Sequence, residues 1–416
     1  MAITVNQQPS AYQPAYSPLI FEATSTQIAS ANFTYTIVCT DLITSATETF
    51  EYEQAPVTGE LVFDAFDFVN RYIKNYVPNN VYGFQKCTDA IRKIRVNIGE
   101  TYGTTPTYYV GSNIDFIVWN GCVEYLEYPN YDQTDYVYKN STNNYKYITS
   151  DTYNTLTGFY TSNKVTYEDK SHFLYCLSSE DNDLEFIRIN CYDSSGTLLH
   201  YSDIDNPYEA GTNYLDKFVC IDVGAKGLTE ISSGLVTGTY PILTSSVAYY
   251  DVIDAYTMPP ATARQNVSRF YIGCEAKHDL YTLHFLDKKG NYETLHFPKK
   301  SEISLEGEKS TYNQTPYRLS SNTWAYSTNT PNKRVFNSNS QKAFKLNSDW
   351  LQKNTVEFYS HIVNSPSVYL DMGSTIGLIP VIVSNNAIPI PNMNDRNLRS
   401  IQVDIRYTFK ETWQNG

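Results

Sequence analysis

Residues 401–410 read IQVDIRYTFK, and this stretch decides the fold class of the chain. Every odd-numbered position carries an apolar or aromatic side chain, and every even-numbered position carries a polar one. Strict alternation over this length is typical of a β-strand with one buried and one solvent-exposed face. We therefore expect a set of inward-facing side chains made up of Ile401, Val403, Ile405, Tyr407 and Phe409.

The segment before this strand predicts one amphipathic helix. Ser348 and Asp349 can cap its N-terminus and place negative charge at the positive end of the helix dipole. Pro366 ends it, because the residue before a proline avoids helical backbone angles. Short apolar runs at 368–370 and 379–383 then predict strands. The apolar stripe of the helix consists of Leu351, Thr355, Phe358, Tyr359 and Ile362.

The first 105 residues predict a β-sandwich with a helix packed on it. Apolar side chains alternate with other residues at 33–39 and again at 94–98, which indicates two strands. Between these strands, apolar side chains from Val62 to Tyr76 fall at helical spacing and predict a helix of about four turns. Pro78 would stop this helix.

The composition indicates a mainly β protein. The 416 residues include 38 tyrosines and 19 phenylalanines, and only 18% are charged, against about 25% in an average domain. We expect a multidomain β-sandwich protein, immunoglobulin-like, with one or two amphipathic helices packed on the sheets. At about 150 residues per domain, the chain has room for three domains. These are an N-terminal β-sandwich with a helix at 1–105, a middle β domain with a long Tyr- and Asn-rich excursion at 106–255, and a C-terminal β-sandwich with a helix at 256–416.

The middle and C-terminal domains share a strand–turn pattern. Residues 186–197 align without gaps over residues 280–291, and each segment has Asp at the start of its turn and Gly at the end. This is the expected chemistry of a tight turn. The pattern is compatible with a duplicated β-sandwich unit and equally with chance in a β-rich chain.

The net charge bears on whether the protein binds nucleic acid, and the cysteines bear on the redox state of its compartment. A net charge of −13 argues against wrapping nucleic acid, which needs a basic surface. It is compatible with lining a passage through which DNA slides, and also with simple solubility. The seven cysteines contain no C-x-x-C pair, which predicts free, buried thiols and a reducing compartment. Neither a signal peptide nor an apolar run of membrane-spanning length is present, so we expect no membrane insertion.

Sequence patterns typical of enzymes are absent. There is no glycine-rich nucleotide loop, no G-x-S-x-G and no H-E-x-x-H. His284 and His296, with Asp287 between them, form the best metal candidate, but no third ligand follows at a metal-site spacing. We interpret both histidines as surface residues on the outer face of a hairpin.

Two acidic pairs are candidates for the carboxyl groups of a glycosidase. Asp181 with Asp183, and Asp203 with Asp205, lie two residues apart and define no cleft. We interpret residues 180–183 as a polar turn, with a calcium site as the alternative. We therefore assign no catalytic, cofactor-binding or metal-binding residue and expect no cofactor.

The abundance of tyrosine is the remaining feature of the sequence that bears on function. The large ring and polar tip of tyrosine suit contacts between subunits that are soluble before assembly, and they also suit stacking on sugars. We expect the polar segments 125–160 and 310–340 to contact partners, and the alternative for 125–160 is a lid packed on its own domain. The most crowded tyrosines are Tyr102, Tyr108, Tyr109, Tyr125, Tyr128, Tyr131, Tyr136, Tyr138, Tyr145 and Tyr147.

Short motifs at both ends of the chain occur in a characteristic order. They are Pro9, Tyr12, Pro14, Tyr16 to Phe21 and Asn32 to Tyr35, and then Asp349-Trp350-Leu351, Ser365 to Leu370, Pro380 to Val383 and Asn394-Asp395-Arg396 before the closing strand. Together they resemble a tail protein family of phages that infect Bacteroidetes, including crAss-like phages. The resemblance covers both ends of the chain well and the middle loosely.

The resemblance implies a virion structural protein of a phage tail or neck and not an enzyme. Such a protein is a subunit of a sixfold or twelvefold homo-oligomeric ring around the DNA channel. Its partners are neighbouring tail or portal-side virion proteins, and genomic DNA passes it without specific binding. It is made in the cytoplasm of the bacterial host and resides in the virion tail.

Two other functions stay open. One is a receptor-binding or glycan-binding protein of the tail tip or a fibre, and the other is a capsule depolymerase. A fibre is normally trimeric, and the chain lacks the repeats of a long fibre.

The absence of enzyme motifs predicts that the purified protein releases no oligosaccharide from bacterial capsule. Glycoside hydrolysis needs two carboxyl groups that face each other across a cleft. A reducing-sugar assay on purified capsule measures this. Release of oligosaccharide that disappears when one acidic residue is changed would contradict the prediction.

Overall fold

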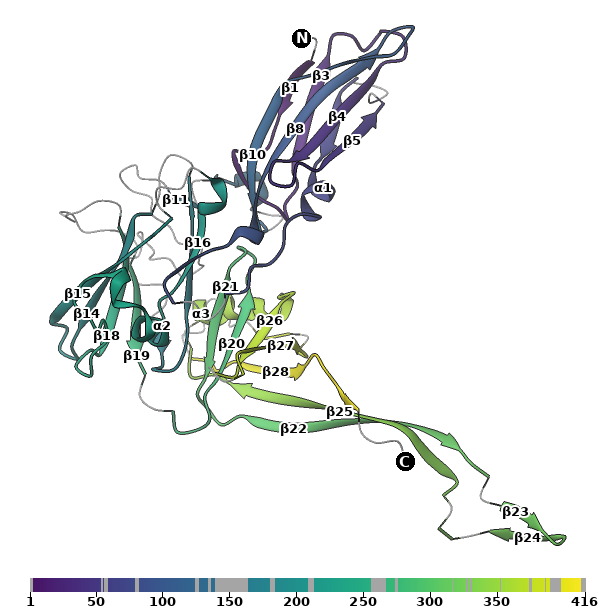
Figure 1. Cartoon of the computed structure of the whole chain (residues 1–416), viewed down its shortest axis with the longest axis vertical. Coiled ribbons are helices and arrows are strands. Elements are labelled where there is room, and N and C mark those ends of the chain that lie inside the picture. Colours follow the sequence, from purple (N-terminus) through teal and green to yellow (C-terminus); the bar gives the residue numbers. More distant parts are fainter. Residues whose placement is uncertain are drawn as a thin grey trace. The chain divides into compact units, whose positions relative to one another are not determined.

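The computed structural model describes residues 3–412 except 54, 56–58, 79–81, 124–126, 134–135, 139–163, 180–183, 209–212, 256–266, 274–275, 316, 327, 330, 352, 374–375, 386 and 390–397. The protein is mainly β, as the composition predicts. It divides into two compact units, one made of Met1–Glu275 with Leu286–Thr294 and the other of Ala276–Phe285 with Leu295–Gly416. Figure 1 labels the main elements.

Two sheets form a β-sandwich at the start of the first unit. Neighbouring strands pair antiparallel, except that β2 and β10 are parallel. The smaller sheet consists, in order, of β1 (Ile3–Gln7), β3 (Ile20–Ser25) and β6 (Leu61–Asp64). The larger sheet consists of β2 (Tyr12–Pro14), β10 (Asn113–Trp119), β8 (Ile91–Tyr102), β4 (Thr34–Asp41) and β5 (Thr47–Tyr52), with β9 (Thr107–Tyr109) paired to β8.

The core of this sandwich lies between the two sheets, where the alternating patterns place it. On the larger sheet, the inward-facing residues of β4 and β8 are fully buried, as predicted. Phe21 of the smaller sheet lies 5.8 Å from Phe116 of β10 between ring centroids. The inward-facing residues of β4 and β8 are Tyr35, Ile37, Cys39, Ile94, Val96 and Ile98.

The N-terminal sandwich extends beyond the boundary expected near residue 105. Residues 113–119 of β10 pair with residues 91–97 of β8. Phe116 and Val118 of β10 are buried in the same core as β4. After β8 the chain forms β9, which pairs antiparallel with the end of β8. The sequence pattern did not predict this strand.

The four-turn helix expected at 62–76 is wrong. Helix α1 spans only Phe66–Asn70, and β6 precedes it. Phe63 is buried and Val62 is exposed, so a period of two describes this segment. The Asp64 carboxylate accepts hydrogen bonds from the N–H groups of Leu19 at 2.9 Å and Phe66 at 3.0 Å, which ends the strand and orients the short helix.

A second β-sandwich completes the first unit. One sheet consists of β11 (Val137–Tyr138), β13 (Phe173–Ser178), β16 (Phe218–Asp222) and β7 (Phe84–Lys86). The other consists of β12 (Lys164–Thr166), β19 (Val267–Ile272), β18 (Tyr249–Ala255), β14 (Phe186–Tyr192), β15 (Leu198–Asp205) and β17 (Val236–Gly238). Helix α2 (Ala225–Glu230) adds Leu228 to the shared core. Short 3-10 turns lie at Thr88–Ala90, Tyr128–Asn130, Tyr214–Asp216 and Ser233–Leu235.

The predicted turns at Asp193 and Asp287 have the same hydrogen-bond geometry. In each, the Asp N–H donates to the carbonyl four residues later and the Gly N–H donates back to the Asp carbonyl. Gly196 and Gly290 have φ of 86° and 88°, which is the left-handed region that favours glycine. The shared turn is confirmed, and a wider duplication stays a prediction.

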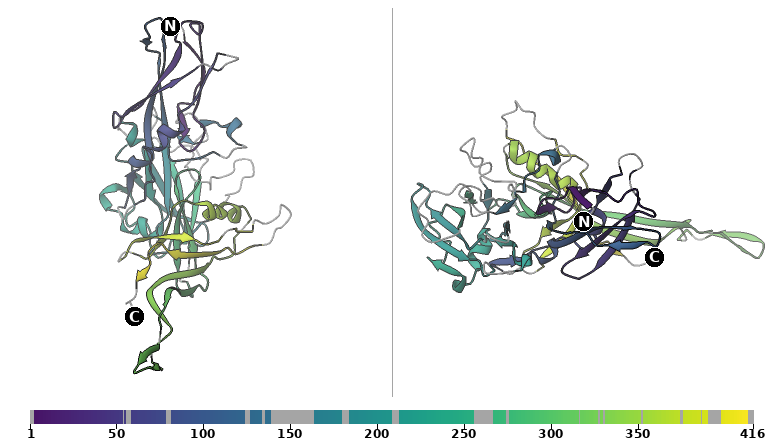
Figure 2. Two further views of the ribbon diagram at one scale, coloured as in Figure 1. Left: turned by 90° about the vertical axis from the view of Figure 1, so that its right-hand side faces the viewer. Right: turned by 90° about the horizontal axis from the view of Figure 1, so that it is seen from above.

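The second unit is built on one large sheet. Helix α3 (Lys353–Tyr359) packs on it and contributes Val356, Phe358 and Tyr359 to the core (Figure 2). A helix therefore closes this core where a second sheet was expected. The order of strands is β21 (Tyr292–Phe297), β20 (Tyr281–Leu286), β26 (Val368–Asp371), β27 (Leu378–Val383), β28 (Gln402–Tyr407), β25 (Lys333–Asn347) and β22 (Glu302–Asn313), with β29 (Glu411–Thr412) paired to β25.

Helix α3 begins later than the expected cap at Ser348. The Ser348 hydroxyl oxygen accepts a hydrogen bond from the N–H of Ile401 at 2.8 Å, which ties this residue to the closing strand. Leu351 forms a β-bridge with Arg399 and not a helical turn. The C-terminal stop is confirmed, because the 3-10 helix Ser360–Asn364 ends at an extended Ser365.

Strand β28 confirms the pattern of the closing stretch. Ile405 is 1% exposed and pairs with Phe344 of β25 and Val383 of β27. The polar residues that alternate with the buried ones are exposed or half-buried. Phe409 is an exception, because the strand ends at Tyr407 and leaves Phe409 47% exposed.

Replacing Ile405 with lysine should unfold the second unit. Full burial of an aliphatic side chain contributes about 1.5 to 3 kcal/mol, and an unpaired buried ammonium costs several more. Gln402→Lys, on the exposed face of the same strand, is the matched control and should melt like wild type. Thermal unfolding followed by circular dichroism compares the two variants. An equal decrease of the melting temperature in both would overturn the assignment of strand faces.

Candidate functional site

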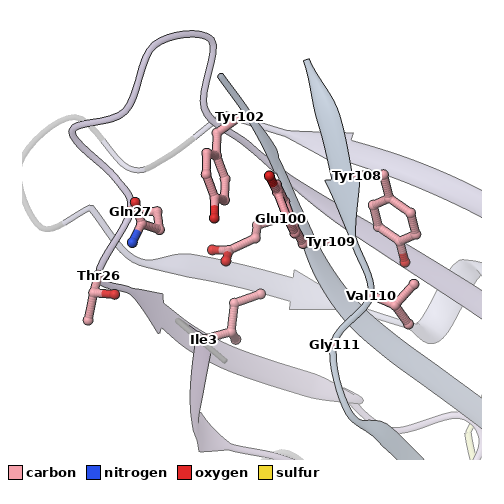
Figure 3. A pocket seen from close by; sticks show the side chains of 9 residues that line it. All are labelled: Ile3, Thr26, Gln27, Glu100, Tyr102, Tyr108, Tyr109, Val110 and Gly111. Atoms are coloured by element: carbon pink, nitrogen blue, oxygen red, sulfur yellow. The ribbon is translucent and has the colours of Figure 1, made fainter. Parts of the chain in front are cut away.

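A cavity of about 630 Å³ opens in the N-terminal sandwich, between its two sheets. It is formed by β1, the turn after β3, β8, and β9 with the loop that follows it (Figure 3). The lining residues are Ile3, Thr26, Gln27, Glu100, Tyr102, Tyr108, Tyr109, Val110 and Gly111.

Two glycines let the rim of the cavity lie against β8. A Cβ atom on Gly111 would lie 1.7 Å from the carbonyl oxygen of Ile98, and one on Gly99 would lie 2.5 Å from the Tyr108 ring. The Asn97 side chain holds the rim, because its Nδ2 donates to the Gly111 carbonyl at 2.7 Å and its Oδ1 accepts from the Gly111 N–H at 3.2 Å. The shape of the cavity therefore depends on close backbone contact at these glycines.

Glu100 supplies the carboxyl group of the cavity. This residue is 4% exposed, and its Oε2 accepts a hydrogen bond from the Ser25 hydroxyl at 2.5 Å. Ser25 Oγ in turn accepts from the N–H of Gln27 at 2.9 Å. Within the part of the chain that the structure describes, the Glu100 carboxylate accepts no other hydrogen bond. Figure 3 shows its carboxyl group turned toward Thr26 and Gln27 across the open space.

Tyr102 and Tyr109 form a stacked pair beside this carboxyl group. Their ring centroids are 4.5 Å apart with an interplanar angle of 17°. Burial raises the pKa of Tyr102, and the nearby Tyr109 and Glu100 raise it further. Burial also raises the pKa of Tyr108. Both hydroxyls therefore keep their protons at neutral pH, and Tyr108 already donates its proton to Asn97 Oδ1 at 3.2 Å.

The lining contains one carboxyl group and no positively charged side chain. This arrangement can bind a polar molecule, but it lacks the carboxyl pair that glycoside hydrolysis uses. The sequence analysis did not identify Glu100 as a site residue, although its position in the strand pattern marks it as unusual. Glu100 continues the inward-facing positions of Ile94, Val96 and Ile98, where a carboxyl group is out of place unless it serves a cavity.

A second candidate surface is a β-hairpin arm in the second unit, which we define as residues 302–342. Strands β22 and β25 pair along its length and continue beyond the other strands of their sheet (Figure 1). Beyond them, β23 (Tyr317–Ser320) and β24 (Thr323–Tyr326) pair with each other to form the tip. Strand β22 is the edge of the sheet, so one side of its backbone is open.

The tip of the arm exposes apolar side chains on one face. Leu319 pairs directly with Trp324, and Tyr317 lies two positions from Leu319, so all three share a face. Their exposed fractions are 72% for Trp324, 59% for Leu319 and 53% for Tyr317. This concentration of exposed aromatic and aliphatic surface is typical of an interaction site.

At the base of the arm, exposed apolar side chains lie on the same face of the sheet as the residues that pack in the core. Ile303 pairs with the buried Phe344 and shares its face, as does Leu305 two positions further on. Both remain more than half exposed. Between base and tip, a β-bulge leaves Phe336 without a cross-strand partner and 54% exposed.

The two polar segments expected to contact partners differ in structure. The segment 310–340, expected as an excursion, contains the outer parts of β22 and β25 and the separate strand pair β23–β24. In the segment 125–160, the Tyr131 hydroxyl donates to the Tyr12 carbonyl at 2.7 Å, and Tyr136 packs 5.5 Å from Trp119 between ring centroids. These contacts fit the lid interpretation. Tyr125, Tyr145 and Tyr147 lie outside the described residues.

The histidines of the metal candidate are not surface residues, so that interpretation is wrong. His284 is 2% exposed, and His296 is half-buried, with Nδ1 2.9 Å from the Thr282 hydroxyl. Asp287 Oδ2 accepts a hydrogen bond from the Lys289 N–H in its own turn. Across the described ranges, no group of three or more His, Cys, Asp or Glu side chains is arranged to hold a metal ion.

The acidic pairs have separate surroundings. Asp203 accepts two hydrogen bonds from Arg188, both at 2.6 Å, and the guanidinium lies over the Tyr201 ring. Asp205 is exposed at the end of β15 and accepts a weak hydrogen bond from Thr237. Residues 180–183, including Asp181 and Asp183, lie outside the described residues.

None of the cysteines in the described residues forms a disulfide, and all except the half-buried Cys122 are buried. Burial raises the pKa of the Cys39 and Cys191 thiols to about 12, so neither is a nucleophile at neutral pH. Cys274 lies outside the described residues.

Asp222 is a buried carboxyl group in the second sandwich. Its Oδ1 accepts hydrogen bonds from the N–H groups of His172 at 2.9 Å and Gly224 at 3.0 Å. Burial raises its pKa to about 6, although these hydrogen bonds and the charge of Lys226 act in the opposite direction. These contacts tie Asp222 into the fold, and we assign it a structural role.

Comparison with protein families and with curated proteins finds no match for this chain. None of the helices in the described ranges has the length and apolar character needed to cross a bilayer.

Asp222 should make stability depend on pH. Its pKa is about 6 in the folded chain and close to 3.8 when unfolded. Its contribution to stability is therefore fully present below pH 4 and is lost as pH rises through 6. Two pKa units correspond to a loss on the order of 3 kcal/mol.

Asp222→Asn should remove this dependence, because the amide oxygen can still accept both backbone hydrogen bonds. Urea unfolding of wild type and variant at pH 4 and pH 7.5 gives the free energy of unfolding of each protein at both pH values. The variant should gain stability relative to wild type as pH rises, and a constant difference between the two proteins would refute the assignment.

Proposed function

We propose that the chain is a structural subunit of a phage tail or neck that assembles with copies of itself into a ring around the DNA channel. The observation that carries this proposal is the arm, residues 302–342. Its described residues form two pairs of antiparallel strands, and its apolar residues contribute little to the core of its own unit.

The arm has the physical character of an element that is completed by a partner. A two-stranded β-ribbon is marginal in water, since it lacks a layer to cover its faces. Yet the tip exposes Trp324, Leu319 and Tyr317, which belong to residue types that gain most from burial. Tryptophan and tyrosine are also the residues that most often dominate interface energies.

An arm also suits the symmetry of a closed ring. Ring contacts are heterologous, which means that one surface of each subunit meets a different surface of the next. The open edge of β22 can pair with a strand of a neighbouring copy through backbone hydrogen bonds. The apolar tip can then bury its side chains in that neighbour. The proposed partner of the arm is therefore a second copy of this chain.

Other properties of the chain agree with this role. The net charge of −13 suits a channel wall that DNA passes without binding. The free thiols suit assembly in the host cytoplasm. The family resemblance of the terminal motifs supports placement in the virion tail. A glycan-binding tail-tip protein stays the alternative, and the cavity at Glu100 is the observation that favours it.

Replacing the tip residues should stop assembly and leave the subunit folded. Loss of an aromatic hot spot costs roughly 2 kcal/mol of binding, or about thirtyfold in Kd. We expect the double variant Leu319→Ser, Trp324→Ser to melt like wild type and to be absent from purified particles. Thr323→Ala, on the opposite face of the tip, is the control and should be incorporated.

Crosslinking identifies the partner. A photoreactive amino acid placed at position 324 should give a product of twice the chain mass in assembled particles. A product of another mass would assign the arm to a neighbouring virion protein. Normal incorporation of the double variant would remove the arm from the assembly contact.

A further inference from the structure

We infer that the cavity at Glu100 is a binding site for a neutral sugar residue. The inference rests on the cavity of the first unit alone and is independent of the proposed ring assembly. Its starting point is a buried carboxyl group with a hydrogen-bonding position left open toward the cavity.

Glu100 sets the polarity of the site. Glu100 Oε1 is accessible from the cavity and is not sealed in the protein, so a ligand that enters the cavity can donate a hydrogen bond to it. The Ser25 hydroxyl fixes the orientation of the carboxyl group through Oε2. Ser25 is itself fixed by the Gln27 N–H, so the acceptor is positioned before any ligand arrives.

The other polar groups of the lining include both donors and acceptors. Gln27 Oε1 accepts from the Ser30 hydroxyl at 3.1 Å, which leaves its Nε2 as a donor. Figure 3 shows Gln27 facing the space beside Glu100 and Tyr102, and Thr26 adds a hydroxyl at the same edge. Sugar hydroxyls both donate and accept, so one pyranose ring can satisfy all of these groups.

The aromatic pair provides the apolar part of the site. Tyr102 and Tyr109 cover one ring face of each other, and Tyr109 is still 45% exposed. The C–H face of a pyranose can pack on such a ring while its hydroxyls reach the polar groups. A volume of about 630 Å³ has room for more than one sugar unit.

The charge of the lining selects among ligands. With one carboxyl group and no cationic side chain, the cavity repels anions such as uronic acids. A cation would pair with Glu100, but it carries no acceptor for Gln27 Nε2 or the Tyr102 hydroxyl. The tyrosines are also stacked nearly parallel, at 17°, and do not surround a point as the rings of a cation cage do.

Saturation-transfer difference NMR on the full chain tests the inference. The probes are glucose, galactose, mannose, N-acetylglucosamine and N-acetylgalactosamine, with glucuronic acid and tetramethylammonium as charged comparisons. We expect saturation of the ring protons of at least one neutral sugar and of neither charged probe. Glu100→Gln and Tyr109→Ala should each weaken binding of that sugar at least tenfold.

Tyr16→Ala is the matched control. Tyr16 is 43% exposed in the same sandwich and lies outside the lining, so this variant should bind as wild type does. Glu100→Gln retains an oxygen acceptor for the Ser25 hydroxyl, and Tyr109→Ala changes an exposed side chain, so both variants should fold. No saturation from any neutral sugar, binding of tetramethylammonium alone, or unchanged binding in both variants would each overturn the inference.

Discussion

The antiparallel pairing of β25 with β28 is the interaction on which the second unit depends. Residues 343–347 of β25 lie against β28, and Phe344 enters the core there. The same strand then continues outward and carries β22 with it as a two-stranded ribbon. Because such a ribbon is marginal in water, its order comes from continuity with the sheet at its base. The buried alternation of β28 therefore supports both the core and the arm.

The sequence predicts the structure best where burial imposes a period. Val403 and Ile405 face the core because β28 has one solvent-exposed face and one buried face. The arm has no buried face to impose alternation, so its strands could not be recognised among Asn, Ser and Thr. The segment from Val62 was misread because its apolar spacing fits a helix, whereas strand pairing of β6 and the Asp64 hydrogen bonds are tertiary effects.

The two candidate surfaces use tyrosine-rich composition in different ways. Around Glu100, aromatic rings frame a carboxyl group that is accessible from the cavity, and this combination favours a ligand rich in hydroxyls. At the tip of the arm, rings and aliphatic side chains are exposed without a polar centre, and burial against protein is the larger gain. Glu100 was detectable in principle from its inward position after Ile98, whereas the shared face of Leu319 and Trp324 required the register of their strands.

Hydrogen–deuterium exchange tests the central claim most directly, by comparing the isolated chain with assembled particles. In an antiparallel edge strand, about half of the N–H groups point away from the only partner strand. We expect peptides covering 302–313 and 317–326 to exchange rapidly in the isolated chain and to become protected in the particle, while those covering β28 are protected in both. Equal exchange of the arm in the two states would contradict the account.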